Sequence, residues 1–144
     1  MDSDSTQLSC KELSGRVIGA AIQVHRTLGP GFLESVYEAA MAIELDVLGI
    51  RYERQKSVAL TYRGRTIGEH RLDLIIEDVL VVELKAVKAL ENIFFAVTRS
   101  YMKATGIENG LLLNFATMPL TVKRVGRETS IWNSENQEKE FLIS

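Results

Sequence analysis

Apolar positions in the first part of the chain recur every three or four residues, which is the spacing of one helix face. Ser9 and Glu12 form the pattern of a capping box directly before this run. We therefore predict a helix from Ser9 to about Thr27, ended by the glycines and proline of residues 29–31. Its apolar face consists of Leu13, Val17, Ala20, Ala21, Val24 and Leu28.

A second helix is predicted from Phe32 to Leu48, with Gly49 as its C-terminal stop. Apolar residues lie around much of its circumference, so we expect burial on more than one side. These residues are Leu33, Val36, Ala40, Ile43, Leu45 and Val47.

The pattern changes after Gly49, where β-favouring residues and turn signals become frequent. We predict strands over 52–62, 66–76 and 79–85, a helix over 91–105, and short strands over 110–115 and 120–125. One domain is expected over 9–127, with a disordered N-terminus over 1–8 and a polar C-terminal tail over 128–144.

Three charged residues, Asp73, Glu83 and Lys85, interrupt two otherwise apolar strands. A three-residue loop over 77–79 places Asp73 opposite Glu83 and puts large apolar side chains on the other face. A two-residue loop would mix polar and apolar side chains on both faces. Register follows the hydrophobic pattern where one face is buried, so we predict the three-residue loop, with paired β-carbons ~5 Å apart. The apolar face is then Leu72, Leu74, Ile76, Leu80, Val82 and Leu84.

Two carboxylates this close repel each other unless one is protonated or a cation lies between them. Carboxylate oxygens suit Mg²⁺ or Mn²⁺, and such a metal can activate water and stabilise charge on a phosphate. Lys85 could orient or deprotonate that water, or offset the developing charge. A cross-strand ion pair of Asp73 and Lys85 on a solvated face explains the same spacing, so both interpretations stay open on residue spacing alone.

Composition limits the class of protein. The 144 residues carry 17 basic and 19 acidic side chains, a formal charge of -2, which excludes a binder that depends on bulk positive charge. The single cysteine, Cys10, excludes an intramolecular disulfide framework and a multi-cysteine zinc site. No apolar run reaches the ~18 residues that cross a bilayer, so we expect no membrane association and a cytoplasmic location.

One local excess of positive charge lies between residues 51 and 71. Within it, Arg54, Lys56 and Arg71 are candidate nucleic-acid-binding residues, because such side chains contact phosphates. Charged side chains also keep the edge of a sheet soluble, and this alternative stays open.

Together these motifs resemble the PD-(D/E)xK nuclease superfamily and, within it, the small bacterial and archaeal GxxExxY family. The motifs that carry the resemblance are Gly31, Glu34 and Tyr37, then Arg71-Leu72-Asp73 and Glu83-Leu84-Lys85. Further similar positions are the segment 24–30, Gln55 before the first strand, the segment 110–115 and Lys123-Arg124.

The resemblance implies a fold of the α/β (α+β) class, a restriction-endonuclease-like core with a mixed central β-sheet flanked by helices. It also implies Mg²⁺- or Mn²⁺-dependent hydrolysis of phosphodiester bonds in nucleic acid, DNA rather than RNA, with a homodimer among the expected states. Asp73 and Glu83 would be metal ligands, helped by the Leu84 carbonyl, and Lys85 would be the catalytic lysine. Glu34 would add a third carboxylate, although a glutamate in the first turn of a helix is also favoured by the helix dipole.

Three further residues are candidates for supporting roles. Tyr37 lies one turn after Glu34 and is expected to pack and to hold a neighbour through its hydroxyl. Tyr101 matches a tyrosine of the family. His25 could contact a phosphate or a metal, although the dipole at a helix C-terminus also favours a histidine.

The resemblance is incomplete in the helix after Lys85. The family commonly has His-x-Ala-Gln there, whereas this chain has Phe94 and Val97 in place of the histidine and the glutamine. Related glutamines are thought to support the active site or to contact nucleic acid. The sequence therefore also fits an alternative, a catalytically inactive nucleic-acid- or protein-binding or regulatory module on the same fold.

Overall fold

The order of elements follows the order that the hydrophobic pattern predicts. The computed structural model describes residues 9–127; the predicted disordered N-terminus and polar tail lie outside the described residues. The elements are α1 (Cys10–Leu28), α2 (Glu34–Leu48), β1 (Tyr52–Tyr62), β2 (Arg65–Ile76), β3 (Leu80–Lys85), α3 (Asn92–Thr105), β4 (Asn109–Asn114) and β5 (Thr121–Gly126). Most boundaries differ from the predicted ones by one residue.

The start of α1 is the capping box that the sequence predicts. The Glu12 N–H donates to the Ser9 hydroxyl, and the Ser9 N–H donates to the Glu12 carboxylate, both at 3.0 Å. In contrast, α2 begins at Glu34, two residues later than predicted, because Leu33 has an extended backbone with φ -73° and ψ 156°. The delay leaves residues 29–33 as a turn that leads into α2.

The sheet is mixed, as the expected fold class requires. Its strand order is β1-β2-β3-β4-β5, and the only parallel pair among the described strands is β3 with β4. A parallel pair needs a crossover, and α3 provides it. This arrangement confirms an α+β fold with a five-stranded sheet.

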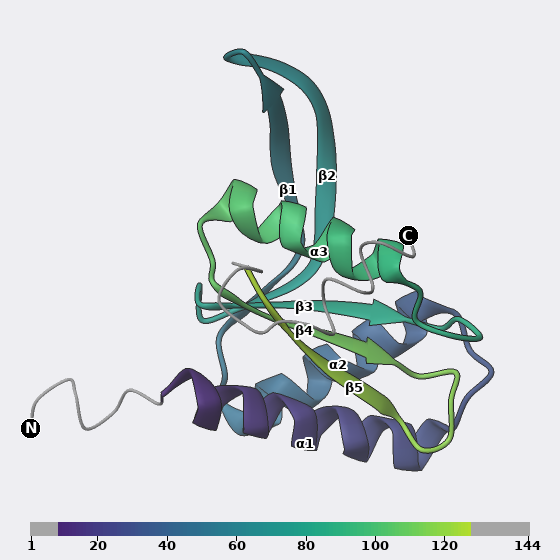
Figure 1. The fold of residues 1–144 in the computed structure, drawn as a ribbon. Coiled ribbons are helices and arrows are strands. Elements are labelled where there is room, and N and C mark those ends of the chain that lie inside the picture. Colours follow the sequence, from purple (N-terminus) through teal and green to yellow (C-terminus); the bar gives the residue numbers. More distant parts are fainter. Residues whose placement is uncertain (1–8, 128–144) are drawn as a thin grey trace, which may run out of the picture.

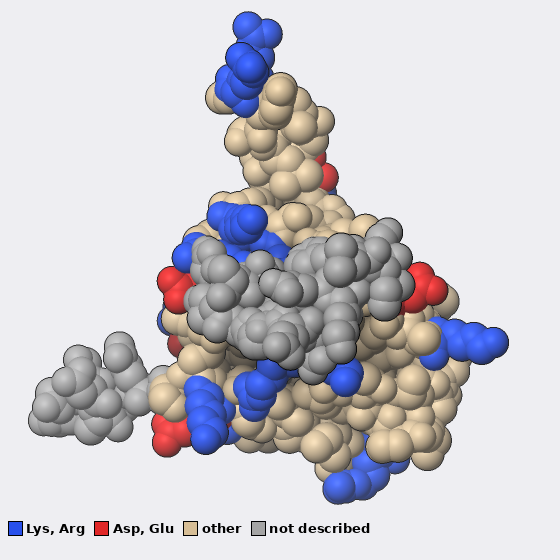
Figure 2. Space-filling view, viewed as in Figure 1, with Lys and Arg blue, Asp and Glu red and all other residues tan. Residues whose placement is uncertain are grey.

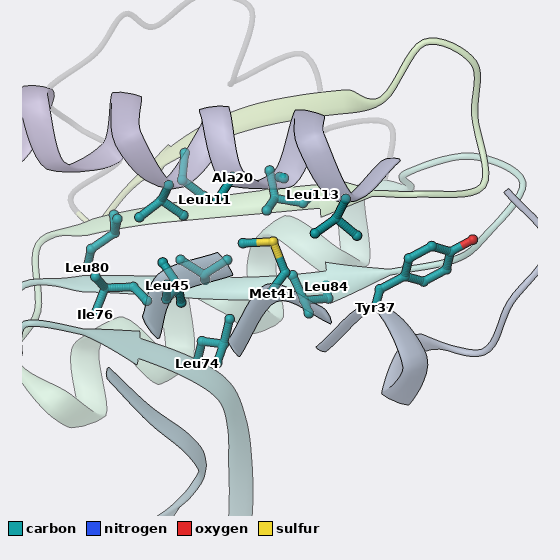
Figure 3. Packing of buried hydrophobic residues seen from close by; sticks show 14 of the residues in the cluster. Ala20, Tyr37, Met41, Leu45, Leu74, Ile76, Leu80, Leu84, Leu111 and Leu113 are labelled. Carbon is teal, nitrogen blue, oxygen red and sulfur yellow. The ribbon is translucent and has the colours of Figure 1, made fainter. Parts of the chain in front are cut away.

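Helices cover both faces of the sheet, with α1 and α2 on one side and α3 on the other (Figure 1). Leu74, Leu84, Leu111 and Leu113 pack against residues of α1 and α2 such as Met41, and Figure 3 shows this core. The opposite face is buried under α3, where Ile75, Val81 and Leu112 pack with Tyr101 and Met102. Burial on both faces explains why β3 and β4 are almost continuously apolar. None of the described helices is long and apolar enough to span a membrane.

The prediction that α2 is buried on more than one side was wrong. Its inner side is buried through Tyr37, Met41 and Leu45, whereas Ile43 is 62% exposed and Val47 is 75% exposed. Apolar residues around a helix indicate burial only where another element covers each side, and within the described residues none covers this outer side of α2.

The predicted register of the β2–β3 hairpin is confirmed by the pairs Leu74–Val82, Ile75–Val81 and Ile76–Leu80. Residues 77–79 form the three-residue loop. Five of the six expected apolar side chains pack in the α1–α2 core, but Leu72 lies in the α3 core. The cause is a bend in β2, because the ladder with β3 ends at Leu74 and β2 then leaves the sheet.

Beyond this bend, β1 and β2 continue as a two-stranded ribbon, residues 57–70, which we call the arm. Figure 1 shows the arm extending away from the sheet on the side of α3. The strand register shifts between Leu60 and Thr61, which marks a bulge within the arm. The arm and α3 therefore border the same region of the sheet.

Candidate active site

Asp73 and Glu83 meet at the point where β2 separates from β3. The Asp73 N–H donates to Glu83 Oε2 at 3.1 Å, and the Leu84 N–H donates to Asp73 Oδ2 at 2.8 Å. Each carboxylate thus accepts a bond from the backbone of the other strand, just beyond the last ladder pair. The separation of two strands is what makes room for these two acids inside the sheet.

Burial controls the protonation of this pair. Glu83 is only 5% exposed, and burial, reinforced by the Asp73 charge, raises its pKa to about 8. Burial also raises the pKa of Asp73, against the lowering effect of the Leu84 N–H bond. The two carboxylates resist being ionised together, because their negative charges repel each other in a buried place. A divalent cation bound between them would supply the positive charge that stabilises the ionised pair.

Lys85 lies at the end of β3, beside the two acids. Its charge lowers the pKa of both Asp73 and Glu83, but within the described residues it forms no ion pair with either. Its Nζ instead lies 4.8 Å from the centre of the Phe94 ring of α3. The ion pair of Asp73 and Lys85 that the spacing also allowed is therefore not the arrangement found.

Glu34 reaches this region from the first turn of α2. Its Oε2 accepts a hydrogen bond from the Ala86 N–H at 3.1 Å, directly after β3. The Glu34 charge is one of the influences that raise the pKa of Glu83. The structure thus brings Glu34 to the same end of β3 as Lys85.

A second group of polar side chains supports Asp73 from α2 and β1. The Gln55 side-chain amide donates to Glu38 Oε1 at 2.6 Å and to Asp73 Oδ1 at 3.3 Å. Glu38 is 7% exposed and also pairs with Arg54 at 3.0 Å. Gln55 lies within β1 rather than before it, with a left-handed φ of 51°. Its conformation interrupts β1 opposite Asp73, since the neighbouring pairs are Arg54–Leu74 and Lys56–Leu72.

Sequence reasoning did not single out Glu38 or His70. Glu38 lies one helical turn after Glu34, so a shared face of α2 was the available signal. His70 comes from the arm and stacks on the Tyr101 ring, with ring centres 3.8 Å apart. His70 and Tyr101 are 31 positions apart, and no local sequence pattern indicates that two residues so distant in the chain are in contact.

Tyr101 of α3 stacks on His70 of the arm and is also affected by the charges of the two carboxylates. Burial raises the pKa of Tyr101 to about 12, with smaller contributions from Glu83 and Asp73. Burial, together with the Lys85 charge, lowers the pKa of His70. Tyr101 therefore keeps its proton at neutral pH, and its hydroxyl can act as a hydrogen-bond donor there.

Tyr37 and His25 lie on the other side of the sheet. The Tyr37 hydroxyl donates to the Gly29 carbonyl at 2.6 Å and accepts from the Phe32 N–H at 3.2 Å, while its ring stacks on Phe115 at 4.5 Å. Tyr37 thus holds the turn before Glu34. His25 contacts the Thr117 carbonyl at 2.8 Å and the Phe115 ring, and the structure does not bring it to the carboxylates.

The three candidate nucleic-acid-binding residues have different surroundings. Arg54 is paired with Glu38, and Lys56 is paired with Glu53 at 3.3 Å. Arg71 is exposed and forms no ion pair within the described residues. Arg54 is thus part of the support of Asp73, and only Arg71 among the three presents an uncompensated charge.

No three acidic, histidine or cysteine side chains of residues 9–127 lie close enough together to hold a metal ion as a group. The donor set that the structure does assemble is the pair Asp73 and Glu83. Their chemistry fits a hard divalent cation, because both supply carboxylate oxygens and both are destabilised by charge when ionised together. Further oxygen ligands would come from the backbone or from water.

The chain is similar to known proteins in sequence and in fold. A family model described as "PD-(D/E)XK nuclease superfamily" matches residues 11–125. No curated protein matches the chain. The crystal structure of SSO0001 is similar with a TM-score of 0.51 and 13% identity, covering 76% of this chain and 58% of that chain. This chain thus spans less than two thirds of the length of SSO0001, and at this identity the likeness shows the fold alone. An alkaline exonuclease from Laribacter hongkongensis, LHK-Exo, gives a TM-score of 0.47 and 12% identity, covering 94% of this chain and 90% of that chain.

Proposed function

The chain belongs to the PD-(D/E)XK nuclease superfamily, and on this basis we propose that it hydrolyses phosphodiester bonds of DNA with Mg²⁺ or Mn²⁺. The observation that carries the proposal is the pair of interlocked carboxylates, Asp73 of β2 and Glu83 of β3, at the point where these strands separate and close to Lys85. Buried acids in the middle of a sheet lower the stability of the fold. Such a cost is typical of a functional site and is avoided at positions that only support the structure.

Asp73 and Glu83 would hold the metal ion, with the Leu84 carbonyl as a backbone ligand and Glu34 as a further carboxylate from α2. A divalent ion bound there supplies a water molecule of lowered pKa and offsets charge on a phosphate. Gln55 orients Asp73 through its 3.3 Å bond, and Glu38 holds Gln55 in place. The chain thus provides a carboxylate site that is supported from two other elements before any metal arrives.

Lys85 acts on the substrate side of the site in this proposal. Its ammonium is held over Phe94 and carries no carboxylate partner within the described residues, so its charge is available to a phosphate or to the attacking water. Tyr101 stays protonated and can donate a hydrogen bond on the same side. Lys85 and Tyr101 would thus stabilise the negative charge of a phosphate bound next to the two acids, and phosphodiester hydrolysis requires this stabilisation.

We further propose that the chain is of the GxxExxY type within the superfamily. Three features give the motif a physical role here. Gly31 adopts a φ of 117°, a value that residues with a side chain rarely adopt. The Tyr37 hydroxyl bonds the Gly29 carbonyl and so holds the turn before α2. Glu34 follows that turn and accepts a hydrogen bond from the Ala86 N–H. The motif therefore positions one carboxylate at the end of β3.

The test is incubation of the protein with duplex DNA, single-stranded DNA and RNA in Mn²⁺ or Mg²⁺. We expect cleavage of DNA that is lost on addition of EDTA and lowered by a factor of about 100 or more in Lys85→Ala. Lys88→Ala is the matched control, since Lys88 follows Lys85 by three residues and has no place in the proposed site. If no nucleic acid is cleaved, or if Lys85→Ala cleaves as fast as the parent protein, the proposal is wrong.

A second candidate function is a binding or regulatory module without catalysis. The observation that favours it is the aromatic side chain of Phe94, which occupies the space beside Lys85 where a polar residue is common in the family. A thermal shift with Mn²⁺ separates the two functions. A metal at 100 times its dissociation constant stabilises the fold by about 2.7 kcal/mol, and Asp73→Asn should abolish that shift in a nuclease. A module without metal would show no shift in either protein.

A further inference from the structure

The end of the arm is an exposed, positively charged surface that the site described above does not use. All six residues of the tip, which we define as residues 62–67, are exposed. The tip contains Arg63 and Arg65 and no acidic residue, and within the described residues neither arginine forms an ion pair. Figure 2 shows this basic surface at the end of the arm, with the acidic atoms visible on the arm nearer its base.

Apolar side chains accompany the two arginines. Tyr62 is 63% exposed and Ile67 is 69% exposed, and the Arg63 guanidinium lies 5.9 Å from the centre of the Tyr62 ring. Arginines alone would serve to keep a hairpin soluble, but an exposed tyrosine and isoleucine beside them work against that purpose. A mixed surface of arginine and tyrosine is typical of contacts with phosphates, sugars and bases.

The turn itself places an arginine where its backbone disfavours one. Arg63 and Gly64 form a two-residue turn, with φ values of 51° and 78°. Glycine is favoured at the first of these positions because it has no Cβ, and asparagine and aspartate because their short polar side chains form local hydrogen bonds there, whereas most other residues are strained at positive φ. The conformation points to a use for the Arg63 side chain beyond closing the hairpin.

The length of the arm sets where such a surface would act. Arg63 lies eight positions after Gln55, which contacts Asp73. At about 3.3 Å per residue the tip is roughly 26 Å along the strand from the carboxylates. The rise of duplex DNA is about 3.4 Å per base pair, so this reach corresponds to roughly 8 base pairs.

We propose that the tip of the arm binds the backbone of the nucleic-acid substrate about 8 base pairs from the cleaved bond. The two arginines contact phosphates, and Tyr62 and Ile67 pack against sugar or base. This inference rests on the proposed function and specifies the length of substrate that the protein needs for full affinity. A duplex too short to reach the tip is held by the carboxylate site alone.

The experiment compares Arg63→Ala/Arg65→Ala with the matched control Lys11→Ala/Arg26→Ala, which removes two exposed positive charges from α1 on the other side of the sheet. Binding to a hairpin duplex of about 5 base pairs, which ends before the tip, and to a duplex of about 30 base pairs is measured in EDTA at several salt concentrations, and cleavage of both is measured in Mn²⁺. The tip variant should bind the long duplex about tenfold more weakly in 0.1 M salt and lower the slope of log K against log salt by about 2. It should bind and cleave the short duplex as the parent does, and the control variant should match the parent on both.

Arg63→Lys/Arg65→Lys keeps the charge and should retain most of the salt slope, which separates loss of charge from loss of fold. Equal losses on short and long duplexes, no loss on either, or an equal loss in the control variant would overturn the proposal. So would loss of binding to anionic lipid vesicles with unchanged binding to DNA, since the tip would then contact a membrane. Absence of all cleavage with a retained length-dependent loss of binding would instead count against the nuclease proposal and support the role of the tip.

Discussion

The Lys85 ammonium lies 4.8 Å from the centre of the Phe94 ring, so an aromatic face of α3 positions the cation at the end of β3. An interaction of this kind contributes about 0.5–1 kcal/mol at an exposed site and more where water is excluded. A histidine is common at the position of Phe94 in the GxxExxY family that this chain resembles, and the contact with Lys85 gives the difference a physical role.

We expect Phe94→Leu to lower kcat about fivefold with little change in KM, because the ring orients Lys85 without contacting substrate. Phe94→Tyr retains an aromatic face and should keep most of the activity. The measurement is steady-state cleavage at fixed metal concentration, with the melting temperature of each variant checked. Equal kcat values for Phe94→Leu and the parent would show that the ring is only part of the core.

The buried charge of Glu83 should make the metal-free protein less stable as pH rises. Burial and the Asp73 charge raise the pKa of Glu83 from 4.5 to about 8, so the folded state binds more protons than the unfolded state between these values. Stability conferred by this group is therefore present below about pH 4.5 and lost progressively towards pH 8. Glu83→Gln should remove this loss, stabilising the protein in EDTA on the order of 2 kcal/mol at pH 8, or about 5 °C in Tm.

Thermal unfolding in EDTA at pH 5 and pH 8 measures this effect. Glu108→Gln is the matched control, because Glu108 is a surface residue paired with Arg127. A parent protein whose stability relative to Glu83→Gln is the same at both pH values would contradict the prediction.

The left-handed conformation of Gln55 allows its effect on the fold to be measured separately from its effect on activity. Gln55→Ala and Gln55→Gly both remove the bonds to Glu38 and Asp73, but only glycine relieves the strain at φ 51°. We expect the glycine variant to be about 1 kcal/mol more stable than the alanine variant, with the same reduced activity in both. Urea unfolding and cleavage assays of the pair test this; a difference in activity that follows stability would mean that Gln55 acts only on the fold.

Removal of the Tyr37 hydroxyl should loosen the turn that precedes Glu34. Tyr37→Phe leaves the Gly29 carbonyl and the Phe32 N–H without their partner, and we expect a loss of roughly 1–2 kcal/mol. Tyr52→Phe is the control, because its hydroxyl bonds Asp46 at the surface and should change stability by less than about 0.5 kcal/mol. Denaturant midpoints of the two variants decide the matter, and equal midpoints would count against a structural role for the buried hydroxyl.

Much of the fold and part of the site could be predicted from the sequence, because they depend on residues close together in the chain. The periodicity of apolar positions predicts the element order, and the Ser9–Glu12 capping box predicts the start of α1. The alternation of apolar residues around the loop at 77–79 predicts the register that brings Asp73 and Glu83 to the same place. A one-residue slip would place Asp73 opposite an apolar residue and mix polar and apolar side chains on both buried faces, which disfavours that register.

Contacts between distant elements were decided only by the tertiary structure. The bend of β2 places Leu72 under α3, and Glu38 of α2 forms an ion pair with Arg54 of β1. The outer side of α2 stays exposed although its residues are apolar, because burial depends on what else lies nearby. Phe94 meets Lys85 for the same reason, since the crossover by α3 brings the helix over the end of β3. The sequence by itself determined which acids share a hairpin, and packing determined which cations, rings and amides surround them.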